Sequence, residues 1–241
     1  MIPFKTCSLA ICVLVLFVGV NDFCSAQGRV IAHQSNNLTA RQLERVHIEE
    51  QGLASLLSDL SLSYEIPIGL ELAVNDDELA VHKIDFSGGS LSDLLTQFVA
   101  QHSQYTWEIK DGVVNIFPKE KYRDLILDEL LSAKIGAFSI KANTSCWDLQ
   151  RSLVSTPEIR RIREVYGIAP SGFNFTGLYF PQLGRNFTLD VSNMSLKSIL
   201  NRVVRESPTA RYWVIKRYTV DQTFFIRFGA RDEDSSLLNQ N

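Results

Sequence analysis

The chain has 241 residues, with 24 Lys and Arg against 27 Asp and Glu, a formal net charge of −3. A nucleic-acid-binding surface needs a strong basic excess or a basic stripe, so this balance argues against a nucleic-acid partner. Three of the four cysteines, Cys7, Cys12 and Cys24, lie near the N-terminus, and Cys146 is the fourth. If the N-terminal segment is removed, no intramolecular disulfide can form, and the fold must depend on its hydrophobic core.

The N-terminus has the order of a secretory signal peptide. Lys5 supplies a positive charge, an apolar run occupies residues 7–20, and small residues precede Gln27. The run is about fourteen residues long, whereas a membrane-spanning helix needs roughly twenty. We therefore expect residues 1–26 to be a signal peptide cleaved between Ala26 and Gln27. The mature protein is then not membrane-spanning, and an uncleaved membrane anchor is the alternative.

Residues 27–44 are polar with little periodicity, and we interpret them as a leader. In residues 45–118 the spacing of apolar residues predicts the order strand, helix, strand, strand, helix, hairpin. Ser90 is placed to cap the second helix, with Asp93 three residues later in a near capping box. Lys110-Asp111-Gly112 is typical of a tight hairpin turn.

Residues 119–136 are charged and partly helical in pattern, and we interpret them as a linker. Residues 137–229 predict a second unit with a strand, two helices, a loop rich in Gly and aromatic residues, a further strand and helix, and a closing hairpin. Residues 230–241 are polar and predicted to be a disordered tail.

An internal repeat relates the two units. DFSGGSLSDLLTQFV (Asp85–Val99) aligns without a gap on DVSNMSLKSILNRVV (Asp190–Val204), with five identities and a shared apolar pattern. Each copy follows an alternating strand and precedes an aromatic hairpin. The sequence therefore predicts an α+β fold of two related modules, each with two helices packed on small β-sheets.

The first unit also resembles a known family. HIEEQGLASLLSDLSLSYEIPIGLEL and KIDFSGGSLSDLLTQFVAQHSQYTWEIKDGVVNIFP look like the secretin and TonB short N-terminal domain of Gram-negative envelope proteins. The resemblance covers residues 46–118 well and 137–229 loosely. It implies helices packed on small sheets in a module that binds other envelope proteins. No channel or receptor segment follows in this sequence, so only the binding role is carried over.

No residue pattern predicts catalytic, cofactor-binding or metal-binding chemistry. The four histidines, at 33, 47, 82 and 102, do not pair at helical spacing, whereas a metal site needs three or four converging ligands. The acidic run 75–78 lacks the alternating ligands of a calcium loop, which favours an ordinary turn. Cys146, near a predicted helix start, is interpreted as a small core residue.

A basic patch is the candidate partner-binding site. It comprises Arg151, Arg160, Arg161 and Arg163. A solvated helix face is the simpler interpretation, and docking of an acidic partner is the alternative.

The leading hypothesis is a non-enzymatic periplasmic protein that binds other envelope proteins as an adaptor or accessory component of secretion, receptor or signalling machinery. One alternative is a secreted enzyme whose site is assembled from distant residues. The other is a eukaryotic secreted glycoprotein, supported by Asn-x-Ser/Thr sequons at Asn37, Asn143, Asn174, Asn186 and Asn193.

Overall fold

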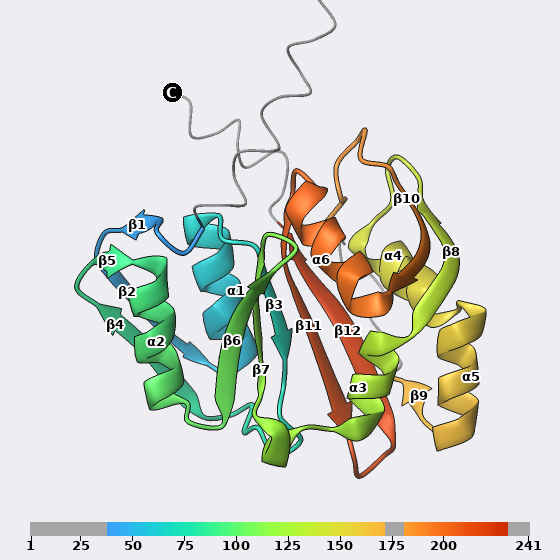
Figure 1. Ribbon diagram of the computed structural model, residues 1–241, viewed down its shortest axis with the longest axis horizontal. Helices are drawn as coiled ribbons and strands as arrows, with labels where there is room; N and C mark the ends of the chain where they lie inside the picture. Colours follow the sequence, from blue (N-terminus) through green and yellow to red (C-terminus); the bar gives the residue numbers. More distant parts are fainter. Residues whose placement is uncertain (1–37, 172–180, 231–241) are drawn as a thin grey trace, which may run out of the picture. The chain divides into compact units, whose positions relative to one another are not determined.

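A mixed sheet of six strands runs through the computed structural model, which describes residues 38–171 and 181–230 (Figure 1). Its strands are, in spatial order, β6 (Tyr105–Lys110), β7 (Val113–Pro118), β3 (Ile68–Glu71), β11 (Ala210–Tyr218), β12 (Thr223–Ala230) and β9 (Ala169–Pro170). The hairpins β6–β7 and β11–β12 are antiparallel, and β3 is parallel to both of its neighbours. The predicted α+β class is confirmed.

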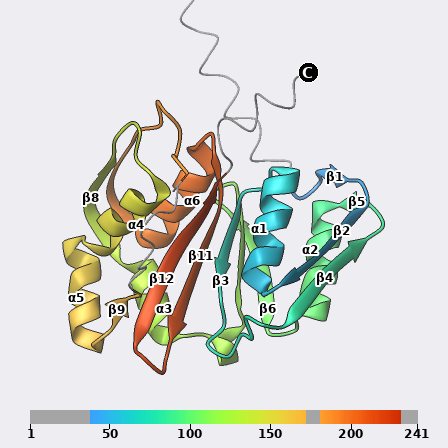
Figure 2. The same cartoon turned by 180° about the vertical axis from the view of Figure 1, so that it is seen from behind.

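The remaining elements of the first half form a layer on one side of this sheet. They are β1 (Gln42–Leu43), β2 (Val46–Gln51), α1 (Leu53–Tyr64), β4 (Val81–Phe86), β5 (Gly89–Ser90) and α2 (Leu91–Gln101). Strands β2 and β4 pair antiparallel, and β1 pairs with β5. Seen from behind, α1 lies beside β3 (Figure 2).

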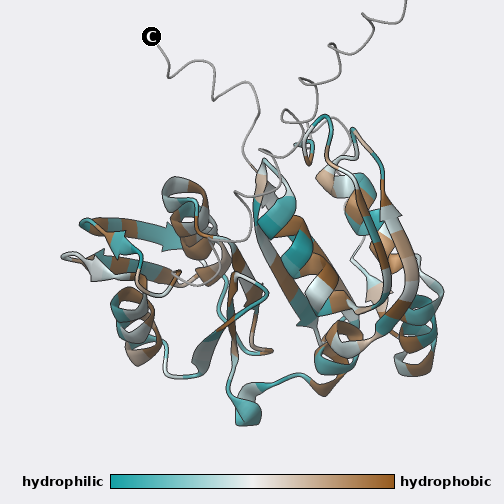
Figure 3. Cartoon of the chain, turned by 45° about the horizontal axis from the view of Figure 1, so that its top comes forward, coloured by the Kyte–Doolittle hydropathy of each residue, from teal (hydrophilic) through white to brown (hydrophobic). Residues whose placement is uncertain are grey.

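The second half adds four helices and two more strands. They are α3 (Leu125–Ser132), β8 (Lys134–Ile140), α4 (Cys146–Val154), α5 (Pro157–Tyr166), β10 (Leu189–Ser195) and α6 (Leu196–Glu206). Strands β8 and β10 pair antiparallel. The helices carry hydrophobic and hydrophilic residues on different sides, which is clearest for α6 (Figure 3).

The two halves share one pairing pattern. In the first, β2 pairs with β4, and β6, β7 and β3 lie side by side. In the second, β8 pairs with β10, and β11, β12 and β9 lie side by side in the same relative order and directions. The internal repeat in the sequence therefore corresponds to a repeated arrangement of strands. The second half differs by an additional helix, α5, between α4 and β9.

Two hydrophobic cores lie on opposite faces of the shared sheet. Leu94, Leu95 and Phe98 of α2 belong to one core. Ile199, Leu200 and Val203 of α6 belong to the other, so the predicted assignment of these side chains is confirmed. Because strand side chains alternate between faces, single strands contribute to both cores. On β11, Tyr212 and Val214 enter the first core, whereas Trp213 and Ile215 enter the second.

Two separately packed modules are not confirmed. Strand β3 of the first half pairs in parallel with β11 of the second over four residues, from Ile68 opposite Tyr212 to Glu71 opposite Ile215. Gly69 lies directly against the Trp213 indole, where a Cβ atom would come within 2.3 Å of the ring. All described residues belong to one compact unit. We predicted few contacts across the linker, and the continuous sheet instead joins the halves through backbone hydrogen bonds.

The predicted linker, residues 119–136, is largely ordered secondary structure. It contains a 3-10 turn (Glu120–Tyr122), α3 and the start of β8. The α3 N-cap, Asp124, accepts hydrogen bonds from two backbone amides and pairs with Arg217 of β11 at 2.6 Å. Buried leucines of α3 join the second core. This segment is therefore part of the second half.

The predicted leader, residues 27–44, also differs from the structure where it is described. Leu43 is buried, and β1 pairs with the turn before α2. The predicted signal peptide (residues 1–26) with its Ala26–Gln27 cleavage site lies outside the described residues, as does the tail beyond Ala230.

Corresponding turns precede α2 and α6. Ser90 accepts from the Asp93 amide in a complete capping box, and Ser195 accepts from the Ser198 amide. Asn193, which aligns with Gly88, has a φ of 50°, a left-handed conformation that Asn tolerates better than most residues. Asn143 lies two residues before the N-cap Ser145 of α4, and Asn193 lies two residues before the N-cap Ser195 of α6. Both have positive φ, 61° and 50°, in the turn that precedes the helix.

Candidate functional site

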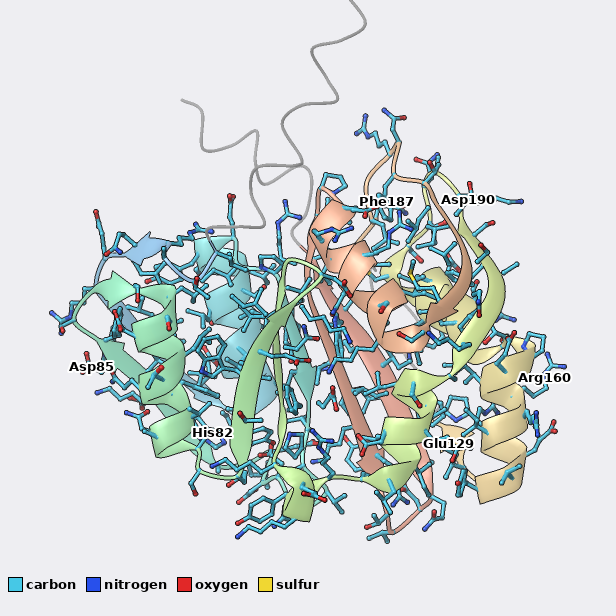
Figure 4. All side chains as sticks on the ribbon, in the orientation of Figure 1. His82, Asp85, Glu129, Arg160, Phe187 and Asp190 are labelled. Atoms are coloured by element: carbon cyan, nitrogen blue, oxygen red, sulfur yellow. The ribbon has the colours of Figure 1, made fainter. Side chains whose placement is uncertain are left out.

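The predicted arginine patch is partly a structural feature. Arg163 donates to the Val154 carbonyl at 3.1 Å and Arg160 to the Ser155 carbonyl at 3.2 Å. Both carbonyls lie at the C-terminal end of α4, where the helix dipole favours positive charge. Arg151 on α4 and Arg161 on α5 are exposed. Figure 4 shows Arg160 on the outer side of α5.

The acidic turn, residues 75–78, is tied into the fold. Asp76 is buried, accepts a hydrogen bond from Tyr105 at 3.0 Å, and its backbone carbonyl accepts from Lys216 at 3.1 Å. Burial raises the pKa of Asp76, against the opposing effects of the Tyr105 hydrogen bond and the Lys216 charge. Glu78 contacts Lys216 at 2.7 Å and Tyr218 at 2.9 Å. The turn therefore anchors the β3–β4 connection onto β11.

Two histidines that are distant in sequence meet beside this turn. The rings of His82 on β4 and His102 at the end of α2 have centroids 5.0 Å apart. Burial, with a smaller effect of the neighbouring His82, lowers the pKa of His102 to about 4, so its ring is neutral near pH 7. Asp76 Oδ2 and His82 Nε2 are buried without a hydrogen-bond partner within the described part of the chain. Sequence spacing gave no sign of this pair because β4 and α2 meet only in the folded chain.

Metal-binding clusters and a reactive thiol were also considered among the described residues. Over residues 38–171 and 181–230, no three His, Cys, Asp or Glu side chains converge as metal ligands. Cys146 is a buried free thiol, and burial raises its pKa to about 12. A thiol with that pKa is overwhelmingly protonated near pH 7 and is a poor nucleophile. This agrees with its interpretation as a core residue.

A partly buried ion pair between the halves was not predicted from the sequence. Lys197 of α6 lies 2.8 Å from Glu71 of β3 and 3.7 Å from Glu108 of β6. Burial raises the pKa of Glu71, and the Lys197 charge opposes this effect. Glu71 is the last residue of the short strand β3, after three uncharged residues, and the sequence gave no other sign of the pair. The pair attaches the helix of one half to strands of the other.

Strand β6 forms one edge of the six-stranded sheet. Among the described strands it pairs only with β7, over six residues without a register shift. Glu108 and Lys110 are exposed, and Trp107 and Ile109 are partly covered by the first core. An edge strand presents backbone N–H and C=O groups to which another strand can add. We therefore take β6 as the candidate protein-binding site.

No family model, curated protein or solved structure matches the chain. Among the described residues, no helix is both long and apolar enough to cross a membrane.

Proposed function

We propose that the chain is a non-enzymatic protein-binding component of the periplasm. It would act as an adaptor or accessory component of envelope secretion, receptor or signalling machinery. The export signal predicted from residues 1–26 supports this location. The edge of β6, to which no second described strand pairs, is the observation that supports the binding role.

The geometry of β6 suits strand addition. It is six residues long, contains no proline and runs in continuous register with β7. Strand addition gains affinity from backbone hydrogen bonds and specificity from alternate side chains. The partner would meet exposed Glu108 and Lys110 on one face of the strand and the partly covered Trp107 and Ile109 on the other.

The family resemblance supports the same role. Residues 45–118 contain the order of elements expected of the short N-terminal domain: β2, α1, β3, β4, α2, β6 and β7, with a two-residue strand β5 before α2. In that family such modules bind other envelope proteins. Arg151 and Arg161, exposed on neighbouring helices, are a secondary candidate contact for an acidic partner surface.

Site-specific photo-cross-linking in the native host tests the proposal. A photoreactive amino acid replaces Glu108 on β6 or, as a matched control, the exposed Glu164 on α5. We expect a discrete covalent adduct with an envelope protein, identified by mass spectrometry, at position 108 and not at position 164. Absence of an adduct at 108, or equal adducts at both positions, would contradict the proposal.

Fractionation and N-terminal sequencing test the location. We expect the mature chain to begin at Gln27 and to be released with the periplasmic contents without detergent. An intact N-terminus on a membrane-bound protein would disprove export with cleavage.

A further inference from the structure

The two edges of the six-stranded sheet differ in how well they resist pairing. Strand β9 is two residues long and contains Pro170, which has no amide hydrogen to donate. Short edge strands and prolines are common protections against unwanted pairing. Strand β6 is six residues long, without proline or bulge. A further strand can therefore pair with the sheet at β6, whereas the short, proline-containing β9 is protected against such pairing.

The hairpin turn determines which backbone groups of β6 point away from the sheet. Asp111 and Gly112 both have positive φ, 56° and 74°, as in a two-residue type I′ turn. In such a turn the flanking residues, Lys110 and Val113, form a hydrogen-bonded pair. Because hydrogen-bonded and free pairs alternate along an antiparallel ladder, Glu108 also bonds to β7. The N–H and C=O groups of Trp107 and Ile109 then face outward, available to a further strand.

The exposed charges on β6 are complementary to themselves in one antiparallel register. If two copies pair about a two-fold axis at Ile109, Glu108 of each copy lies opposite Lys110 of the other. Ile109 then supplies the outward hydrogen-bonding groups at the axis, and the Glu108–Lys110 pairs take the close, non-hydrogen-bonded positions. A register centred on Glu108 would instead oppose two carboxylates. Charge therefore selects the register centred on Ile109.

We propose that β6 is a homodimerisation edge, joining two copies of the chain through antiparallel pairing centred on Ile109. The inference deepens the proposed function, since it names a second copy as a partner of the same edge. Glu108 also lies 3.7 Å from Lys197, but Lys197 is closer to Glu71, and about half of the Glu108 side chain (46%) is exposed. Glu108 is thus accessible to a second partner.

The contact is short, so the dimer is concentration-dependent. A pairing of about five residues buries less than the standard interface of about 1,600 Å², which favours weak affinity. Analytical ultracentrifugation of the mature chain from about 1 µM to about 1 mM covers this range. We expect a reversible shift from monomer to dimer and no larger species.

Charge reversal tests the register. Lys110→Glu places like charges opposite each other at two positions, and we expect the dimer dissociation constant to rise by about tenfold or more. Glu108→Lys should do the same. The double variant Glu108→Lys/Lys110→Glu restores both pairs and should return the constant to near the wild-type value. Circular dichroism confirms that each variant is folded. A double variant as weak as the single ones would overturn the register.

A disulfide provides a second test that does not depend on charge. The two-fold axis brings the two Ile109 Cα atoms to about 5.5 Å, within disulfide range. We expect Ile109→Cys to form a covalent dimer under mild oxidation and Glu164→Cys to form none. Cys146 is buried with a raised pKa and does not compete.

These outcomes separate the inference from the proposed function. A chain that stays monomeric at every concentration overturns the homodimer, even if Glu108 cross-links to a different envelope protein. Assemblies larger than a dimer also overturn it, because a two-fold contact closes on itself. A dimer with no heterologous adduct at Glu108 supports the homodimer and contradicts a wider partner role.

Discussion

Strands β6 and β11 hold equivalent places in the two halves but have opposite environments. Each is the first strand of a hairpin that follows a helix, α2 or α6. The outer side of β11 is covered by β3 of the first half, whereas the outer side of β6 has no partner strand among the described elements. Correspondingly, Val214, Ile215 and Lys216 of β11 are buried, while Glu108 and Lys110 of β6 are exposed.

The comparison shows that two halves with the same arrangement of strands can expose different strands at the edge of the sheet. Joining two three-strand sheets side by side covers the β11 edge and leaves the β6 edge without a partner strand among the described elements. The side chains follow this difference. The face of β6 turned away from α2 carries the exposed Glu108 and Lys110, whereas the face of β11 turned away from α6 carries Tyr212 and Val214, which are buried in the first core. The position of β6 at an edge is therefore a consequence of how the halves join. Substitutions at the junction should show how strongly the stabilities of the two halves are coupled.

The largest effect is expected from shortening a buried leucine in either helix. Leu95 and Leu200 are both fully buried, so Leu95→Ala and Leu200→Ala should each cost roughly 2–5 kcal/mol of unfolding free energy. Because the two cores share a sheet, we expect each variant to lower a single common transition in urea. Hydrogen exchange measures the two halves separately. A variant that melts only its own half would restore the model of independent modules.

Removal of the ion pair between the halves should be nearly as costly and depend on pH. Lys197→Met leaves Glu71 buried without its cation, which should cost about 3 kcal/mol near pH 7.5. The pKa of Glu71 in the folded chain is already raised above its ordinary value of 4.5. Protonated Glu71 therefore contributes its full stability below pH 4.5, and this contribution is lost as the pH rises through the folded-state pKa. Loss of Lys197 raises that pKa further.

Unfolding of the Lys197→Met variant and the wild type at about pH 4.5 and about pH 7.5 checks this sign. The difference between them should be small at the lower pH and larger at the higher one. The double variant Glu71→Gln/Lys197→Met is the matched control and should lose most of the pH dependence. An effect that is equal at both pH values would contradict the assignment.

A methyl group at the sheet junction should have an intermediate effect. Gly69→Ala places a Cβ atom about where the Trp213 ring lies, at a distance of 2.3 Å, so the ring or β3 must move. Such overpacking should cost about 1–3 kcal/mol and change Trp213 fluorescence. In Gly136→Ala the added atom meets only the end of the Glu158 side chain, at 3.1 Å. Equal stability of the two variants would contradict tight packing at the junction.

The smallest effect is expected at the helix caps. Ser90→Ala and Ser195→Ala should each cost about 1 kcal/mol in thermal or urea unfolding. Ser90 should cost more, because its loss also breaks the reciprocal capping box with Asp93, which α6 lacks. A larger loss at Ser195 would show that the two repeats differ in ways that cap geometry does not describe.

Local sequence signals predicted many of the elements correctly. The leucine spacing of α1, the Ser90 cap of α2 and the Asp111-Gly112 turn of the β6–β7 hairpin are all present as expected. These features depend on nearby residues, since helix periodicity, capping and turn conformation act over a few positions. The short strand β1 was missed, because its two residues have too little pattern to stand out from a polar segment.

The sequence by itself determined the α+β class, the repeat and the two sets of core residues on α2 and α6. Only the tertiary structure decided that the halves share a sheet, that Lys197 meets Glu71, and that His82 lies beside His102. It also decided which of two equivalent strands is left at an edge. The physical reason is that strand pairing and side-chain contacts between distant segments depend on the packing of the whole chain, whereas alternation along a strand does not specify its neighbour.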